Sequence, residues 1–455
     1  MLGSSWPDLV VRTGLTDGQD ERGLSYGTNM EDGTISERVG YLEILQVNPT
    51  YRRYFIANVL SMVGTWFTTI ALFILAADIS GLPELAVGIV LVLRMFSLAL
   101  PQPFTGMLAD RFSRKWLMAI SHVLSAACAL LLLFVDGPDD AVLYYSMVIM
   151  LMVLHAVYVP AESAAIPNLV GEGEALITAN AMNSATWSAS LAIGAALGGF
   201  VVAAYGTDVA FVIDAATFLV SALMIATLTI PQEKVENPGT IIGGGVRLIL
   251  DGFRRIRRTP PVYRILSAKA LWSIGGGGLV YCLVMIGDEI GVADVAAGIG
   301  VLFAARGIGS GLGPIVARAV LRERSRWPFY LGGLVSLCGL FYVLVALIPW
   351  TPWITVLVLL AHAASGANWV LSTVMLQERT EDDWRGRVFA TDFLLMTTVN
   401  GTSSLIAALM IAYVGIDLRT LVLIFAVGQT ISGLIWLSVM LPGERRYFVE
   451  NQGSE

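Results

Sequence analysis

Long apolar runs separated by short polar connections dominate the pattern of this chain. A helix needs about 20 apolar residues to cross the hydrocarbon core of a bilayer. Twelve runs reach about that length, and the connections between them are short except for residues 231–262. The predicted spans are 54–78, 84–109, 116–135, 142–165, 177–204, 209–230, 263–286, 294–317, 328–349, 353–376, 388–414 and 418–441. The pattern therefore predicts an all-α membrane protein with twelve transmembrane helices.

Composition supports this interpretation and excludes several classes of function. Of the 455 residues, 56% are hydrophobic and only 14% are charged, whereas a soluble domain carries roughly a quarter charged residues. The basic residues are scattered over short loops, which argues against a nucleic-acid partner. The sequence has no nucleotide-binding loop, zinc motif or nucleophile elbow, so we expect no enzymatic activity, no cofactor and no metal.

Lysine and arginine concentrate in alternate connections. Basic residues precede the first span and follow the second, sixth, eighth, tenth and twelfth. The six loops on the other side hold one basic residue between them, Arg419. Cytoplasmic loops of membrane proteins are enriched in Lys and Arg. We therefore expect a protein of the inner cell membrane with both termini in the cytoplasm.

The two halves of the chain repeat at a nearly constant spacing. Gly106, Arg111 and His155 have copies 207 residues later, and Tyr54 and Asp208 have copies 209 residues later. This repeat predicts two pseudo-symmetric six-helix bundles, the architecture of a transporter that rocks about a central site. The predicted segments are an acidic, disordered tail 1–50, a bundle 51–230, a linker 231–262, a bundle 263–442 and a cytoplasmic tail 443–455. The linker is either an amphipathic helix on the inner leaflet or a solvated connection.

The stretch GMLADRFSRK, residues 106–115, places four charged side chains between two apolar runs. It resembles the signature loop of the major facilitator superfamily, both in sequence and in its place between the second and third spans. Ser113 stands where that family usually has glycine. We assign the stretch as a gating motif whose key residues are Gly106, Asp110, Arg111, Arg114 and Lys115. Topology explains the basic residues but not Asp110, so we predict that Asp110 biases the equilibrium between outward-open and inward-open states.

Other segments narrow the resemblance. Residues 179–206, 211–223 and 385–390 resemble a branch of bacterial exporters that includes the enterobactin exporter and macrolide efflux proteins. Two features depart from the pattern: IGAALGG replaces the glycine–proline pair of the fifth span, and VLHAVYVPAESAAIP lacks the arginine signature of many proton antiporters. The resemblance implies a monomeric exporter whose partners are a small-molecule substrate, protons and membrane lipids.

Several ionisable residues interrupt the predicted spans, where such residues are costly and usually functional. Arg94 and Arg306 lie well inside their spans, and Glu162 and Asp214 are the candidate partner acids. One hypothesis is that these four residues couple proton binding to transport by exchanging partners. The alternative is a set of permanent ion pairs that only hold helices together. Lys269 lies near the end of its span, so it either snorkels to the interface or is functional.

The resemblance also implies that the first, fourth, seventh and tenth spans line a central cavity. Large aromatic faces suit bulky amphiphilic ligands, whereas the alternative for each tryptophan is packing against lipid. The cavity candidates are Asn58, Trp66, Trp187, Trp272, Asn368 and Trp369. His155 and His362 are either titrating groups or ordinary core residues. We therefore expect proton-coupled export of an amphiphilic small molecule such as a drug or siderophore; the alternatives are a lipid or nutrient carrier and a non-transporting membrane sensor or scaffold.

Overall fold

The computed structural model describes residues 40–232, 241–292 and 294–452. Within these ranges the chain is α-helical apart from short 3-10 turns, one π-helical turn and the connecting loops, and it contains no strand. Eleven helices of this part of the chain are long and apolar enough to cross a membrane, and a bent helix pair brings the total to twelve. The predicted all-α, twelve-span fold is confirmed.

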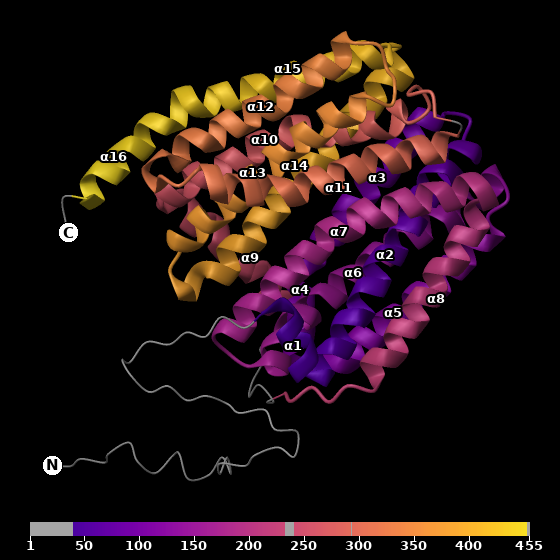
Figure 1. The fold of residues 1–455 in the computed structure, drawn as a ribbon, viewed down its shortest axis with the longest axis horizontal. Coiled ribbons are helices and arrows are strands. Elements are labelled where there is room, and N and C mark those ends of the chain that lie inside the picture. The colour runs from indigo at the N-terminus through magenta and orange to yellow at the C-terminus, as the bar shows by residue number, and fades with distance from the viewer. Residues whose placement is uncertain (1–39, 233–240, 293, 453–455) are drawn as a thin grey trace. The chain divides into compact units, whose positions relative to one another are not determined.

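The helices of the two halves form two groups (Figure 1), coloured indigo to magenta in the first half and salmon to yellow in the second. The first half contains α1 Tyr41–Val47, α2 Pro49–Asp78, α3 Pro83–Ala99, α4 Gln102–Arg111, α5 Arg114–Leu131, α6 Ala141–Val170, α7 Glu174–Tyr205 and α8 Thr207–Ala226. Helix α9 spans Ile241–Arg258. The second half contains α10 Pro260–Ile286, α11 Val295–Val320, α12 Trp327–Leu347, α13 Ile354–Glu378, α14 Asp382–Val414, α15 Leu418–Ile435 and α16 Leu441–Gln452.

The second predicted span, 84–109, is broken into two helices. These are α3 and α4, whose axes are bent by 43°. Pro101 and Pro103 lie at the break, and proline there removes a backbone N–H donor while its ring clashes with the preceding turn. The gating motif therefore begins in a short helix of its own, at an angle to the rest of the span.

The two bundles meet along two helix pairs, because small residues allow close approach there. Helix α7 packs on α11, and α3 packs on α14. A Cβ added at Gly199 would lie 2.5 Å from the carbonyl oxygen of Ala296, and one added at Gly88 would lie 2.2 Å from the Cβ of Ala408. Such contacts between small residues bring helix backbones together in a membrane.

Residues 41–47 and 49–50 are helical, although the sequence pattern placed them in a disordered tail. Helix α1 contributes Ile44 to a buried cluster that also contains Tyr51 of α2. Asn48 caps α2, because its side-chain oxygen accepts a hydrogen bond of 2.8 Å from the backbone N–H of Tyr51. Residue Pro49 then begins α2 with a backbone angle suited to a first helical turn. The rest of the predicted tail, 1–39, lies outside the described residues.

The linker contains the helix α9 over residues 241–258. Helix α9 packs against α4 of the first half and α14 of the second. Its Ile256 is buried, whereas the side chains of Arg247 and Arg254 are 85% and 71% exposed. The helix is therefore amphipathic and contacts both bundles at once. Residues 233–240 lie outside the described part of the chain.

The segment after the last span is also helical. Helix α16 is attached to the second bundle by Glu444, whose carboxylate is fully buried. Its two oxygens lie 2.5 Å from Arg264 of α10 and 2.6 Å from Arg379 at the end of α13. The predicted cytoplasmic tail 443–455 is thus a docked helix as far as Gln452, because two arginines offset the cost of burying one carboxylate.

Candidate functional site

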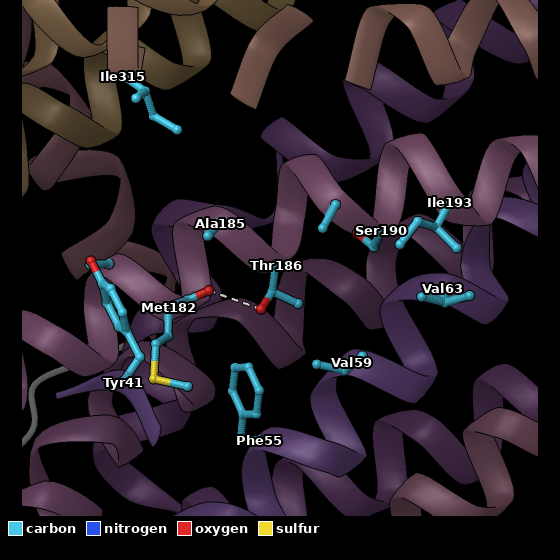
Figure 2. A pocket seen from close by; sticks show the side chains of 12 residues that line it. Tyr41, Phe55, Val59, Val63, Met182, Ala185, Thr186, Ser190, Ile193 and Ile315 are labelled. Atoms are coloured by element: carbon cyan, nitrogen blue, oxygen red, sulfur yellow. Dashed lines mark hydrogen bonds between the residues drawn. The ribbon is translucent and has the colours of Figure 1, made fainter. Parts of the chain in front are cut away.

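A cavity of about 530 Å³ lies between α2 and α7, with contributions from α1 and α11. Figure 2 shows Phe55, Val59 and Val63 of α2 facing the α7 side chains. The spacing of four residues places these three on one face of the helix. The lining residues are Tyr41, Phe55, Val59, Val63, Ala181, Met182, Ala185, Thr186, Ala189, Ser190, Ile193 and Ile315. The wall is therefore almost entirely apolar, and none of the six predicted cavity residues belongs to it.

The cavity extends from the first turns of α2, beside the basic residues that precede the first span, to the middle of that helix. On the opposite side the bundles are in contact: the Tyr281 hydroxyl at the end of α10 donates a hydrogen bond of 3.0 Å to the backbone oxygen of Glu84, at the start of α3. The Gly88–Ala408 contact lies one turn further along α3. The two bundles are therefore in contact at the ends of the helices where α3 begins and α10 ends.

A buried polar cluster lies beside the cavity and shares helices α2 and α7 with it. The Tyr54 hydroxyl donates a hydrogen bond of 2.6 Å to the Glu162 carboxylate of α6. Asn58 donates a hydrogen bond of 2.7 Å to the side-chain oxygen of Asn183 on α7. Glu162 is 8% exposed, and no cation of the described residues lies within ion-pair distance of it. We call these four residues the Glu162 cluster.

Arg94 and Asp214 form a second polar centre in the first bundle, without direct contact. Asp214 is fully buried; one carboxylate oxygen accepts a hydrogen bond of 3.3 Å from Thr217, and the other has no partner among the described residues. Arg94 lies within electrostatic range of Asp214, but the two do not form an ion pair. A permanent pair between Arg94 and either candidate acid is therefore not present in this conformation.

The second bundle contains a related arrangement around Arg306. The guanidinium lies 5.4 Å from the centre of the Phe303 ring, and within electrostatic range of Tyr342 and His362. These two side chains share a hydrogen bond of 2.9 Å. The repeated histidines thus have corresponding neighbours: His155 of α6 lies within range of Arg94, as His362 lies within range of Arg306.

Lys269 does not snorkel. Its side chain is 2% exposed, and its ammonium nitrogen lies 2.7 Å from the carboxylate of Asp392 on α14. The ammonium group also lies 4.8 Å from the ring of Trp369 and 5.8 Å from that of Phe389. Sequence reasoning missed Asp392, although an acid inside the predicted span 388–414 was a sufficient signal to consider it.

The structure brings some of the predicted aromatic residues together and separates others. Trp272 and Trp369 lie 6.4 Å apart, and the Trp272 indole donates a hydrogen bond of 3.0 Å to Ser365. Asn368 is buried beside them, and its side-chain oxygen has no partner among the residues described. In the other bundle Trp66 packs against Phe303 at the seam between the bundles, with ring centres 6.0 Å apart.

Trp187 of α7 is 47% exposed and lies outside the cavity wall.

Some side chains of the gating motif make contacts with neighbouring residues in this conformation. Arg114 holds α5 to α6 by donating hydrogen bonds of 2.9 Å to the Ala164 carbonyl and 3.1 Å to the Asn168 side chain. Lys115 lies over the ring of Trp116, at 5.1 Å, and Arg111 is exposed. Asp110 is exposed and makes no ion pair or hydrogen bond with another described residue.

A Cβ added at Gly106 would meet no atom within 4 Å, so no close helix contact requires glycine at this position of the gating motif in this conformation.

Comparisons with known proteins agree with this architecture. The sequence profile of the Major Facilitator Superfamily matches residues 54–398. The chain is 26% identical over 217 residues to "Uncharacterized MFS-type transporter YfiS" of Bacillus subtilis (strain 168), covering 45% of this chain and about half (48%) of that relative. It is 24% identical over 297 residues to "Putative bacilysin exporter BacE" of Bacillus subtilis, covering 64% of this chain and 71% of that protein.

Solved structures show the same fold. A peptide transporter of the POT family in complex with alafosfalin has a TM-score of 0.68 at 12% identity, covering 90% of this chain and 99% of that one. The nucleoside transporter NupG has a TM-score of 0.63 at 16% identity, covering 86% and 98%. The narrower resemblance to enterobactin and macrolide exporters stays a prediction. The profile match over most of the chain, together with the twelve-span fold, shows that this chain belongs to the Major Facilitator Superfamily of membrane transporters.

Proposed function

We propose that this protein exports an amphiphilic small molecule by secondary active transport, driven by the entry of protons. One observation carries the proposal: an apolar cavity between α2 and α7 lies beside a buried carboxylate of α6 that has no cation, and the other members of the Glu162 cluster lie on α2 and α7. The cavity offers a place for the substrate, and Glu162 offers a place for the proton. The relative named as an exporter, BacE, supports the outward direction of transport.

The cavity favours a substrate with a large apolar surface. Its volume of about 530 Å³ lies within the usual range for pockets that bind small molecules, which are mostly apolar with a few polar groups. Thr186 and Ser190 are the polar side chains in its wall apart from the Tyr41 hydroxyl. The Thr186 hydroxyl already donates a hydrogen bond of 2.8 Å to the Met182 carbonyl (Figure 2). Few polar groups therefore remain to bind a strongly hydrated solute.

Glu162 supports proton coupling for a different reason. An ionised carboxylate is costly in a dry site unless a cation or several hydrogen bonds compensate it, whereas a protonated carboxyl is not. Among the described residues, Glu162 accepts a hydrogen bond from the Tyr54 hydroxyl and lies close to the amides of Asn58 and Asn183, but it has no cation. Opening the site to water or closing it would therefore change how readily Glu162 binds a proton. Protonation of Glu162 is in this way linked to the equilibrium between the outward-open and inward-open states.

The test is transport by purified protein in proteoliposomes under an imposed pH gradient, screened with a panel of drugs and siderophores. We expect wild-type protein to accumulate at least one compound and to release protons into the opposite compartment. Glu162→Gln should abolish accumulation but keep downhill exchange, at matched protein levels. Glu323→Gln, which removes an exposed carboxylate (55% exposed), is the matched control and should behave as wild type.

Two results would overturn the proposal. A wild-type protein that moves no compound of the panel would favour a sensor or scaffold. A Glu162→Gln protein that accumulates substrate as wild type does would exclude Glu162 as the coupling site, and Asp214→Asn would then be compared in the same assay.

A further inference from the structure

Arg306 is a permanent charge in the middle of a transmembrane helix. It is the twelfth of the 26 residues of α11, so it lies about 17 Å from the helix start at 1.5 Å per residue. The guanidinium stays protonated in proteins and presents five N–H donors in a rigid fork. A bare charge at this depth is costly, so arginines inside membranes usually face water, an acid or a ligand.

The described residues do not supply a partner for this charge. No carboxylate of theirs lies within ion-pair distance of Arg306, and none of them forms a hydrogen bond with it. The titratable groups within electrostatic range are Tyr342 of α12 and His362 of α13, which are hydrogen-bonded to each other. The ring of Phe303 provides the remaining contact, at 5.4 Å.

The buried acids of the predicted spans lie close to other residues than Arg306. Glu162 accepts a hydrogen bond from Tyr54, and Asp392 pairs with Lys269. Asp214 lies within electrostatic range of the other interior arginine, Arg94, rather than of Arg306. Arg306 is therefore the intramembrane arginine without an acid nearby in the described part of the chain.

The sequence neighbours of Arg306 connect it to the wall of the apolar cavity. Phe303, one turn before it, packs against Trp66 of α2, which is one turn beyond the lining residue Val63. Gly307, the next residue, packs so closely on α7 that an added Cβ would lie 2.4 Å from the backbone nitrogen of Ala192. Ala192 is adjacent to the lining residue Ile193. Arg306 is not itself a lining residue, but it belongs to the turn of α11 that packs against α2 and α7 next to the cavity wall.

We propose that Arg306 binds an oxyanion of the transported molecule, a carboxylate or a phosphate, while the apolar body of that molecule occupies the cavity. This inference rests on the proposed function and narrows its substrate class from amphiphiles in general to amphiphilic anions. The guanidinium fork suits a bidentate contact with either oxyanion. The ligand, rather than the protein, would then supply the missing counter-charge.

The first test is the thermal stability of the empty protein. Replacing Arg306 by Gln removes a charge without an acid partner, so the midpoint of unfolding should stay constant or rise. Asp392→Asn, which leaves Lys269 without its carboxylate, is the matched comparison and should lower the midpoint. A fall for Arg306→Gln as large as that for Asp392→Asn would overturn the inference, because it would show that Arg306 holds the fold together.

The second test compares two probes of the same shape, 1-pyrenebutyrate and the uncharged 1-pyrenebutanol, on the protein in lipid nanodiscs. Energy transfer from tryptophan to pyrene reports binding. Because hydrogen bonds to charged groups are worth about 1.5–3 kcal/mol, the butyrate should bind about tenfold more tightly, or better. Arg306→Gln should reduce its affinity to that of the alcohol, and Arg306→Lys should keep part of the preference.

Equal binding of the two probes by wild type, or an unchanged preference in Arg306→Gln, would overturn the inference. Its failure is distinguishable from failure of the proposed function. Glu162-dependent accumulation of the neutral alcohol without any preference for the butyrate would refute only the anion site. A preference for the butyrate that depends on Arg306, in a protein that accumulates nothing under a pH gradient, would instead refute only the proton-driven export.

Discussion

The buried pair of Lys269 and Asp392 allows a sharp prediction about stability. The two charged atoms lie 2.7 Å apart, and their side chains are 2% and 6% exposed. Removing one partner leaves the other charge buried without compensation. We expect Lys269→Met or Asp392→Leu alone to destabilise the protein by about 3–5 kcal/mol, or about two to three and a half orders of magnitude in the unfolding equilibrium.

The double variant Lys269→Met/Asp392→Leu should behave differently from both single variants. It removes both charges together and fills the same space with apolar atoms, so its stability should lie close to that of wild type. The free energies of the two single variants should therefore fail to add by several kcal/mol, which a double-mutant cycle measures directly. The unfolding equilibrium can be followed in mixed micelles by tryptophan fluorescence, because Trp369 lies 4.8 Å from the ammonium nitrogen.

An exposed pair of the same length provides the control. Arg324 and Glu378 also lie 2.7 Å apart, but their side chains are 65% and 46% exposed. Exposed ion pairs contribute about 0–1 kcal/mol, so Arg324→Met should have little effect. The reasoning is refuted if Lys269→Met costs no more than Arg324→Met, or if the double variant is as unstable as the sum of the two single variants.

Three further predictions concern gating and topology. Asp110→Asn should slow transport several-fold while insertion stays normal, because an acid that topology does not require is lost; wild-type rates at equal membrane levels would contradict this. Gly199→Val should keep the bundles apart where the seam is now closed, raising the labelling rate of a cysteine introduced there, whereas Gly333→Val, with no atom within 4 Å of its Cβ, should not. A cysteine added beside Arg446 should resist a membrane-impermeant reagent applied outside the cell, and one added within 136–140 should react; the reverse pattern would invert the topology.

The spans and the family could be predicted from sequence because their signals are local. The hydrocarbon thickness of a bilayer sets the length of each apolar run, so twelve runs predicted twelve spans without any knowledge of packing. The gating motif is a continuous stretch of ten residues, and its place between two spans is a matter of counting. Even the break in the second span had a local cause, since Pro101 and Pro103 are adjacent to it in sequence.

The pairing of charges depended on how the helices pack, and here the sequence was insufficient. Lys269 and Asp392 are 123 residues apart, and no periodicity within either span shows that the two face each other. The position of the cavity also depends on helix packing and was not predicted. Its wall comes mainly from aliphatic faces of α2 and α7, whereas tryptophan and asparagine side chains were expected there. In a membrane both lipid and protein partners are apolar, so the hydrophobic pattern does not distinguish a helix face that meets lipid from one that meets another helix. Small residues such as Gly199 and Gly307, which determine how closely backbones approach, decide which faces are brought together.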